Sequence, residues 1–370
     1  MIESGRDRLR RALQNGVAPE VWIRFPRQLG DVVFSMPFLG ELQADWNQVA
    51  AELGMKLRWI AVGHDIGVSL LAEANPQFIA ETTIEHMGMG KPDPWNLLRR
   101  WRERQPVAVI NLSQSVRLSL AAWMARVPVR AGDADNHLGF LYHYSFSYRQ
   151  PTGHLVLRFG GLLQQLTGRT RMAWLPLGPD RLGGETGLDL LRSLGWQGEP
   201  FVALAFGTRL DSKRWFPEEE KWPELARLLM AQGYRVLWLG GPDEVPLGAR
   251  LAALSPGSLN ATGLTSIPQA CAIQSQAYGT VAVDTGLAHT SAATGRPTVT
   301  VFGGPTFECF ASPQGPHAQT VRAPVVDMSP SPGPVAAHLN DTFRLDPARV
   351  ALLLHALAGE AQAAETGSRA

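Results

Sequence analysis

The sequence predicts an α/β protein of two domains, each built on a parallel sheet. The chain has 370 residues, which is more than one hydrophobic core usually organises. Hydrophobic residues make up 45% of the chain, enough to bury sizeable cores. Short apolar runs of strand length alternate with segments of helical periodicity along its whole length. That alternation is the pattern of successive βαβ units.

The first domain is predicted to span residues 1–175. Its strands are expected at 21–25, 57–62 and 107–111, where aliphatic runs open into turns. Its helices are expected at 31–46, 95–104, 115–126 and 154–166.

The second domain is predicted to span residues 176–345 and has the clearer pattern. The boundary is placed at residues 175–187, because two prolines and four glycines there separate the two series. Strands are expected at 201–206, 235–239, 280–283 and 298–302, and helices at 222–231, 244–254, 267–276 and 287–293. Residues 346–370 are expected to add a helix at 347–357, after a proline-rich stretch at 324–334, and a disordered tail from Gly359.

Charge and cysteine content exclude several classes of protein. Lys plus Arg number 34 against 33 for Asp plus Glu, so no global field favours nucleic acid. The only cysteines, Cys271 and Cys309, cannot build a disulfide framework or a zinc site by themselves. No run approaches the roughly 18 apolar residues of a membrane span. Residues 1–16 lack the apolar core of a secretory signal, so a cytoplasmic protein is expected.

The Arg-rich N-terminus permits a peripheral membrane contact. Four arginines surround Leu9 and Leu13 with the spacing of a short basic amphipathic helix, which would lie on anionic lipid at the inner face of the membrane. A frayed, solvated helix fits the pattern equally well. The arginines are Arg6, Arg8, Arg10 and Arg11.

The strongest local signal is a strand, turn and helix at residues 281–293. Ligands of open α/β sheets bind beyond the carboxyl ends of strands, where a helix N-terminus offers N–H groups to phosphate. The alternative is that Asp284 is only an N-cap and His289 only a satisfied helix residue. The candidate phosphate-binding residues are Asp284, Thr285, Gly286, Leu287, Ala288 and His289.

A second loop, residues 205–217, again follows a buried strand. Thr208 supplies a hydroxyl and Lys213 a cation, which a departing diphosphate would need. The alternative is a solvated basic turn, which fits Arg209 and Arg214 taken singly better.

A third loop, residues 24–37, crosses from the first strand to the first long helix. Asp31 lies where that helix begins, so it is either a helix cap or a base that accepts the proton of an attacking sugar hydroxyl. Arg24 and Arg27 in the same loop are candidate acceptor-binding residues.

Together these blocks resemble glycosyltransferase family 9, the bacterial lipopolysaccharide heptosyltransferases, over most of residues 20–345. The family's Gly-Asp-Val turn resembles residues 29–33, and its Lys-x-Trp-Pro loop resembles residues 213–217, with an extra Phe216 before the proline. Its Asp-Thr-Gly-x-x-His block resembles residues 284–289. The blocks that follow in the family resemble residues 295–297 and 304–306, and its turn near the nucleotide resembles residues 240–244, which contain Glu244.

The resemblance implies a GT-B fold of two Rossmann-like domains and an inverting sugar transfer from an ADP-heptose-like donor. It implies that Asp31 is the general base, that Lys213 and Thr208 contact the diphosphate, and that residues 284–289 cradle phosphate. The second domain would hold the donor and the first the glycan or glycolipid acceptor. Asn111, where an acidic residue is expected, Gly303–Gly304 and residues 307–310 depart from the family pattern and bear on sugar and acceptor identity.

Other functions remain as rivals. Asp133-Ala-Asp135 matches the Asp-x-Asp string of metal-dependent transferases, but we expect a solvated loop after an edge strand there, and neither metal nor cofactor. Neither half has the glycine fingerprint of a dehydrogenase or a Walker loop. A GT-B-like sugar-nucleotide epimerase and a non-catalytic nucleotide-sugar-binding protein remain open.

Overall fold

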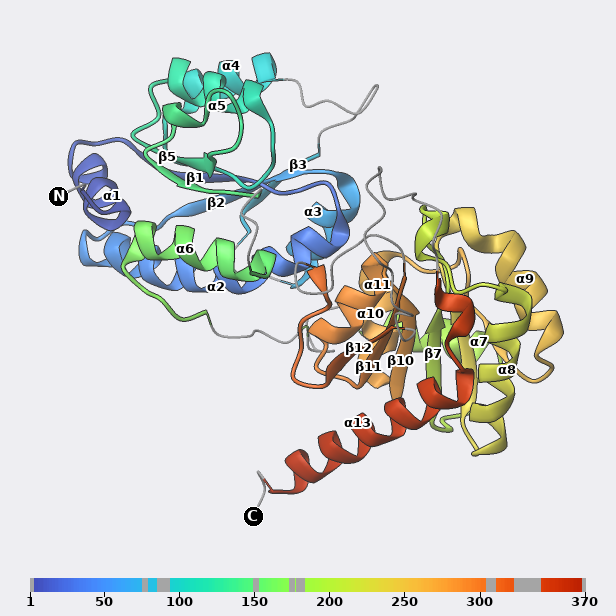
Figure 1. Cartoon of the computed structure of the whole chain (residues 1–370). Coiled ribbons are helices and arrows are strands. Elements are labelled where there is room, and N and C mark those ends of the chain that lie inside the picture. Colours follow the sequence, from blue (N-terminus) through green and yellow to red (C-terminus); the bar gives the residue numbers. More distant parts are fainter. Residues whose placement is uncertain are drawn as a thin grey trace. The chain divides into compact units, whose positions relative to one another are not determined.

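The computed structural model describes residues 3–74, 79–84, 94–148, 153–172, 177, 184–303, 311–322 and 341–367. The chain divides into two compact units, Met1–Leu175 and Pro176–Ala370. Each unit contains a six-stranded sheet whose strand pairs are all parallel (Figure 1). The predicted α/β class is confirmed. Predicted blocks at 304–306, 307–310 and 324–334 lie outside the described residues.

The first unit has the strand order β3-β2-β1-β4-β5-β6. Helices α4 and α5 cover one face of this sheet, and α2 and α6 cover the other (Figure 1). The elements are α1 Gly5–Gln14, β1 Ala18–Arg24, α2 Leu29–Glu52, β2 Arg58–Gly63, α3 Asp65–Ala74, β3 Glu81–Ile84, α4 Pro94–Arg104, β4 Pro106–Asn111, α5 Val116–Met124, β5 Val129–Asp133, the 3₁₀ turn η2 Gly139–Leu141, β6 Tyr144–Phe146 and α6 Leu155–Thr167.

The second unit has the order β12-β11-β10-β7-β8-β9. Its elements are α7 Gly184–Ser193, β7 Phe201–Ala205, η4 Asp211–Lys213, α8 Glu218–Ala231, β8 Arg235–Leu239, η5 Pro242–Glu244, α9 Val245–Leu254, β9 Leu259–Asn260, α10 Ile267–Gln276, β10 Gly279–Val283, α11 Gly286–Ala293, β11 Thr298–Phe302, β12 Ala318–Arg322, η6 Asp341–Arg344 and α13 Pro347–Gly367.

In each sheet the order of strands reverses at the strand that comes first in the chain. The reversal lies between β1 and β4 in the first sheet and between β7 and β10 in the second. A crevice opens beyond the carboxyl ends of strands at such a switch point, and ligands bind there. The topology therefore selects the loops after β1 and β4 and the loops after β7 and β10 as candidate sites.

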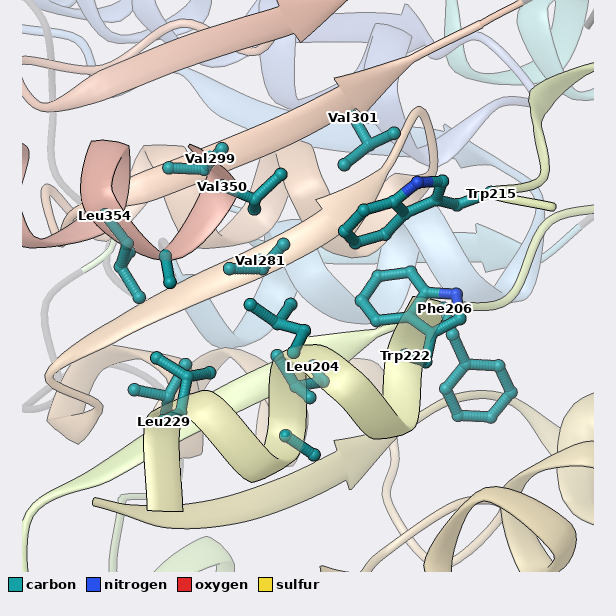
Figure 2. Close-up of a cluster of buried hydrophobic side chains, with 14 of the residues drawn as sticks. Leu204, Phe206, Trp215, Trp222, Leu229, Val281, Val299, Val301, Val350 and Leu354 are labelled. Carbon is teal, nitrogen blue, oxygen red and sulfur yellow. The ribbon is translucent and has the colours of Figure 1, made fainter. Parts of the chain in front are cut away.

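The core of the second unit explains how its loops are fixed. Strands β7, β10 and β11 are fully buried, and β8 is buried except at Arg235. Val281, Val299 and Val301 pack with Trp215 and Trp222 on one face of the sheet (Figure 2). Helix α13 completes this layer with its own apolar side chains, Val350 and Leu354. It continues as far as Gly367, so the disordered tail predicted from Gly359 is wrong up to that residue, because the alanine-rich sequence there favours helix.

Helix α1 differs from both predictions made for it. Leu9 and Leu13 are fully buried, and the helix contacts α2 and α6. Its apolar face is therefore not available to lipid, nor is the helix frayed. The structure describes no helix that combines the length and the apolar character needed to cross a membrane.

Candidate functional site

The loop after β7 and the end of β10 meet through an ion pair. Lys213 Nζ lies 2.5 Å from Oδ2 of Asp284, although that oxygen has no hydrogen-bond partner among the described residues. The Asp284 side chain is 5% exposed and that of Lys213 is 20% exposed. Because β7 and β10 pair side by side, their loops bring a cation and a carboxylate to one point of the sheet edge. The second and first predicted motifs therefore form one site.

The Lys213 loop is fixed from behind by a residue distant in the sequence. Thr342 in η6 donates a hydrogen bond to the Arg214 carbonyl at 2.7 Å and accepts one from Phe216 N at 3.3 Å. Trp215 is fully buried and packs edge to face on Trp222, with ring centres 5.1 Å apart. Lys213 therefore stands next to a stretch of chain that Trp215 anchors in the core and Thr342 holds through the backbone.

Helix α11 presents its N-terminus beside that ion pair. Thr285 holds the N-cap position but makes no side-chain capping hydrogen bond. The first N–H groups of a helix have no partner within the helix, so those of Gly286 and Leu287 suit an anionic ligand. Asp284 precedes the cap, so the alternative that it is the N-cap is wrong.

A second residue that the sequence did not reveal holds α11 in place. Gln274 in α10 donates to the Leu287 carbonyl at 2.9 Å and accepts from Thr290 Oγ1 at 2.8 Å. Ala288 packs in a small buried cluster with the strands beneath it. His289 Nε2 lies 3.9 Å from Oδ1 of Asp284, so the histidine faces the carboxylate that Lys213 also approaches.

Glu244 lies against the glycines that follow β7 and β8. Its Oε2 accepts a hydrogen bond from Gly241 N. A Cβ on Gly207 would stand 2.4 Å from Glu244 Cγ, and one on Gly241 would stand 2.9 Å from Oε2. Glycine at these positions is what lets the carboxylate approach both strand ends. This places Glu244 at the same sheet edge as Lys213.

The other residues of the loop after β7 differ in burial and in their partners. Thr208 is half-buried, and its Oγ1 accepts a hydrogen bond from Leu210 N at 3.4 Å. Arg214 pairs with Asp211 and Glu218 at 3.0 and 3.3 Å, which agrees with a structural role for that arginine. Arg209 is exposed.

The first unit places a carboxylate at its own switch point. Gln28 holds the N-cap position of α2, so Asp31 lies in the first turn and is not the cap. Arg24 is buried at the end of β1, where it donates a hydrogen bond to the Phe25 carbonyl, whereas Arg27 is exposed. Tyr148, which the sequence analysis did not single out, lies near the Asp31 carboxylate. Burial raises the pKa of its phenol, and the carboxylates of Asp31 and Asp133 raise that pKa further.

Asn111 at the end of β4 has a structural task. It lies level with Arg24 in the β1–β4 pair. Its amide donates to Tyr142 Oη at 2.8 Å, and its Oδ1 accepts from Ser113 Oγ at 2.6 Å. An uncharged residue suits these two contacts, because the amide donates one hydrogen bond and the carbonyl accepts the other.

The Asp-x-Asp string was expected in a solvated loop after an edge strand, but the strand before it is internal to the sheet and the first aspartate is buried. Asp133 ends β5, which lies inside the sheet, and its side chain is buried, which raises its pKa. Its Oδ1 accepts from Asp135 N at 3.0 Å, and Asp135 Oδ1 accepts from Ser147 Oγ at 2.6 Å. The two carboxylates thus shape a turn. Among the described residues, no three His, Cys, Asp or Glu side chains gather as metal ligands would.

A protein-family model matches residues 95–331, that of glycosyltransferase family 9 (heptosyltransferase). Lipopolysaccharide heptosyltransferase 1 of Escherichia coli is 36% identical over 133 residues, which are 36% of this chain and 39% of that protein. The chain is therefore matched over less than half the length of this curated relative.

Two solved structures are similar over nearly their whole length. A family 9 glycosyltransferase of Veillonella parvula has a TM-score of 0.76 at 20% identity, covering 92% of this chain and 97% of that one. The ADP-heptose heptosyltransferase II of Escherichia coli has a TM-score of 0.73 at 20% identity, covering 93% and 99%. These likenesses confirm the GT-B fold.

Proposed function

This chain belongs to glycosyltransferase family 9, and we propose that it is an inverting transferase that moves a heptose-type sugar from a nucleoside diphosphate to a hydroxyl of a glycan or glycolipid. The donor of the Escherichia coli heptosyltransferase II is named as ADP-heptose, and we extend that donor class to this chain. A lipopolysaccharide-core-like acceptor follows from the same family membership.

The observation that carries the proposal is the placement of Lys213 against Asp284 beside the N-terminus of α11. A nucleoside diphosphate carries its negative charge on two phosphates. The Lys213 ammonium and the first N–H groups of α11 are donors that fit those phosphates. We assign Thr208 to the same diphosphate, and Glu244, at the ends of β7 and β8, to the nucleoside.

Bond breaking then follows from charge. As the bond between the anomeric carbon and the diphosphate oxygen breaks, its electron pair stays on the diphosphate, where negative charge grows. Lys213 interacts more strongly with that growing charge than with the intact donor, so it lowers the barrier. His289 and Asp284 hold the ammonium side of the site in position.

The acceptor hydroxyl supplies the new bond. A neutral hydroxyl is a weak nucleophile near neutral pH, and a positioned carboxylate accelerates its attack by about 10²–10⁴-fold. We assign this base to Asp31, which takes the proton as the acceptor oxygen bonds to the anomeric carbon on the face opposite the diphosphate. Arg24 and Arg27 are assigned to the acceptor. The mechanism uses no metal ion.

Two rival functions make different forecasts. An epimerase consumes no acceptor and returns a nucleotide-sugar of altered stereochemistry, and a pure binding protein turns nothing over. The test is to incubate the protein with ADP-heptose, with and without acceptor. Release of ADP that depends on acceptor supports the transferase, whereas a new nucleotide-sugar without acceptor, or binding without turnover, would contradict it.

A glycolipid acceptor would bring the enzyme to the cytoplasmic face of a membrane as a peripheral protein. Because Leu9 and Leu13 of α1 are buried, we infer that another surface makes that membrane contact.

A further inference from the structure

The outer surface of α4 and α5 carries aromatic and cationic side chains together. Trp95 and Trp123 are 62% and 51% exposed, unusual values for the largest apolar side chain. The surface, called here the α4–α5 face, is formed by Trp95, Arg99 and Arg102 of α4, Arg117 and Trp123 of α5, and Arg126 just after α5.

The outward residues do not serve the core of the unit. Leu97, Leu98 and Trp101 point inward from α4 with helical spacing and pack with Leu118 and Ala121 of α5 on the sheet. Figure 1 shows the two helices together on one side of the sheet, with α2 and α6 on the other. The sheet is thus already covered on this side by the inner faces of α4 and α5.

The face has an excess of positive charge. It bears four arginines, with one acidic residue, Glu103, beside Arg99 and Arg102, while the whole chain has a net charge of only +1. Among the described residues, Arg102, Arg117 and Arg126 form no ion pair; Arg99 donates a hydrogen bond to Asn96 of its own helix.

Helix α1 is the instructive contrast, because its arginines are neutralised within the unit. Arg6 pairs with Asp45, Arg10 with Glu52, and Arg11 with Glu3. The positive charge that the sequence suggested for α1 is therefore balanced, whereas that of the α4–α5 face is not.

Hollows along the helix pair combine the two kinds of side chain. One of about 330 Å³ is lined by Trp95, Arg117 and Leu120. Another, of about 480 Å³, is lined by Arg102, Met124 and Arg126 among others. Each offers an apolar wall with a guanidinium group beside it.

We propose that the α4–α5 face is the surface by which the protein docks on an anionic lipid bilayer. Tryptophan places its amphipathic ring at the level of the lipid headgroups, and arginine is attracted by anionic phospholipid while its stem contacts the acyl boundary. The arginine excess matches the negative surface charge of such a bilayer. The docking gives the proposed glycolipid transfer its location, and in that sense rests on the proposed function.

The test is cosedimentation of the full-length protein with phosphatidylcholine vesicles that contain about a third phosphatidylglycerol. Each unpaired arginine near an anionic surface contributes to binding, so R102Q/R117Q/R126Q should weaken binding by about 10-fold or more. W95A/W123A should weaken it through lost apolar contact. High salt and vesicles of phosphatidylcholine alone should weaken binding of the unaltered protein.

The matched control is R11Q/L157A. Arg11 and Leu157 are 61% and 67% exposed, but they lie on α1 and α6 and not on the α4–α5 face. The control should bind vesicles as the unaltered protein does. All variants should keep the melting temperature of the unaltered protein.

The proposal would be overturned if the arginine variant bound vesicles as well as the unaltered protein, or if the control lost as much binding as the α4–α5 variants. It would also be overturned if the protein did not bind vesicles but formed a dimer that the W95A/W123A exchange dissociates. The last result would assign the face to a second copy of the chain.

A water-soluble acceptor without acyl chains separates this proposal from the transferase itself. The α4–α5 variants should transfer sugar to that acceptor at the rate of the unaltered protein. Turnover without any vesicle binding would refute the docking surface alone, and vesicle binding without turnover would refute the transferase alone.

Discussion

Lys213 and Asp284 are joined at 2.5 Å, Nζ to Oδ2, although 71 positions separate them in the chain. The pair ties the loop after β7 to the end of β10, whose helix α11 presents its N-terminus there. If Lys213 binds the diphosphate as proposed, a lysine held in this way loses little side-chain freedom when the donor binds.

Lys213→Ala is expected to lower kcat/KM by about 10²-fold, because it removes a charge that acts mainly on the departing diphosphate. It also leaves a buried carboxylate without its cation, which costs about 1–3 kcal/mol of folding free energy. Steady-state kinetics and thermal melting measure the two effects.

The double variant K213A/D284N separates stability from catalysis. It should recover much of the melting temperature and none of the rate. Lys221→Ala, a change of the same kind on α8, should leave both unchanged. If K213A had the kcat and KM of the unaltered protein, Lys213 would have no role in stabilising the departing diphosphate.

Gly207→Ala is expected to weaken binding of the nucleoside diphosphate, because the new Cβ would stand 2.4 Å from Glu244 Cγ and push the carboxylate away. Calorimetric titration with ADP measures the loss. Gly359→Ala, where a Cβ meets nothing within 4 Å, is the control and should bind ADP normally. If G207A bound ADP as well as the control, Glu244 would not be a nucleoside ligand.

Chelation is expected to leave transfer intact, because Lys213 and the α11 N-terminus supply the positive charge that a metal supplies elsewhere. The measurement is the rate of ADP release before and after EDTA. Loss of activity that Mg²⁺ or Mn²⁺ restores would show that the metal-free mechanism is wrong.

The stability of the first unit is expected to fall as the pH drops from about 6.5 to 4. Burial and the guanidinium groups of Arg130 and Arg8 lower the pKa of His143 to about 4, against 6.5 ordinarily. Between these values the unfolded chain binds the proton and the folded chain does not, so acid favours unfolding. His143→Gln should show a smaller fall in melting temperature over this range. An equal fall would assign the effect to other groups.

Seven of the eight inner strands that the structure describes were predicted, whereas the inner strand β5 was expected at an edge and the outer strands were missed. β1, β2 and β4 of the first sheet and β7, β8, β10 and β11 of the second are apolar runs, because both their faces are covered. β3, β6, β9 and β12, the four edge strands, are short or partly exposed and carry no such run. Pattern reasoning therefore finds the centre of a parallel sheet before its edges.

The site was predictable only in part, for a related reason. Lys213, Asp284 and Glu244 follow buried strands, and their positions follow from the topology. Thr342 and Gln274 act through hydrogen bonds to residues 126–128 and 13–16 positions away, for which a single sequence holds no signal. The N-terminal arginines misled in part because Asp45 and Glu52, the partners of Arg6 and Arg10, are distant in the chain.

Asp31→Asn tests the central claim most directly. Gln28 occupies the cap position, so the exchange leaves the cap intact and removes the negative charge from the first turn of α2, where a charge of this sign contributes about 0.3–1 kcal/mol. Asparagine is nearly isosteric but cannot take up a proton. The measurement is kcat for acceptor-dependent ADP release, with the melting temperature and the Kd for donor as controls. We expect both controls to hold while kcat falls by about 10²-fold or more. A kcat near that of the unaltered protein, in a folded variant that binds donor, would contradict the assignment of Asp31 as the base.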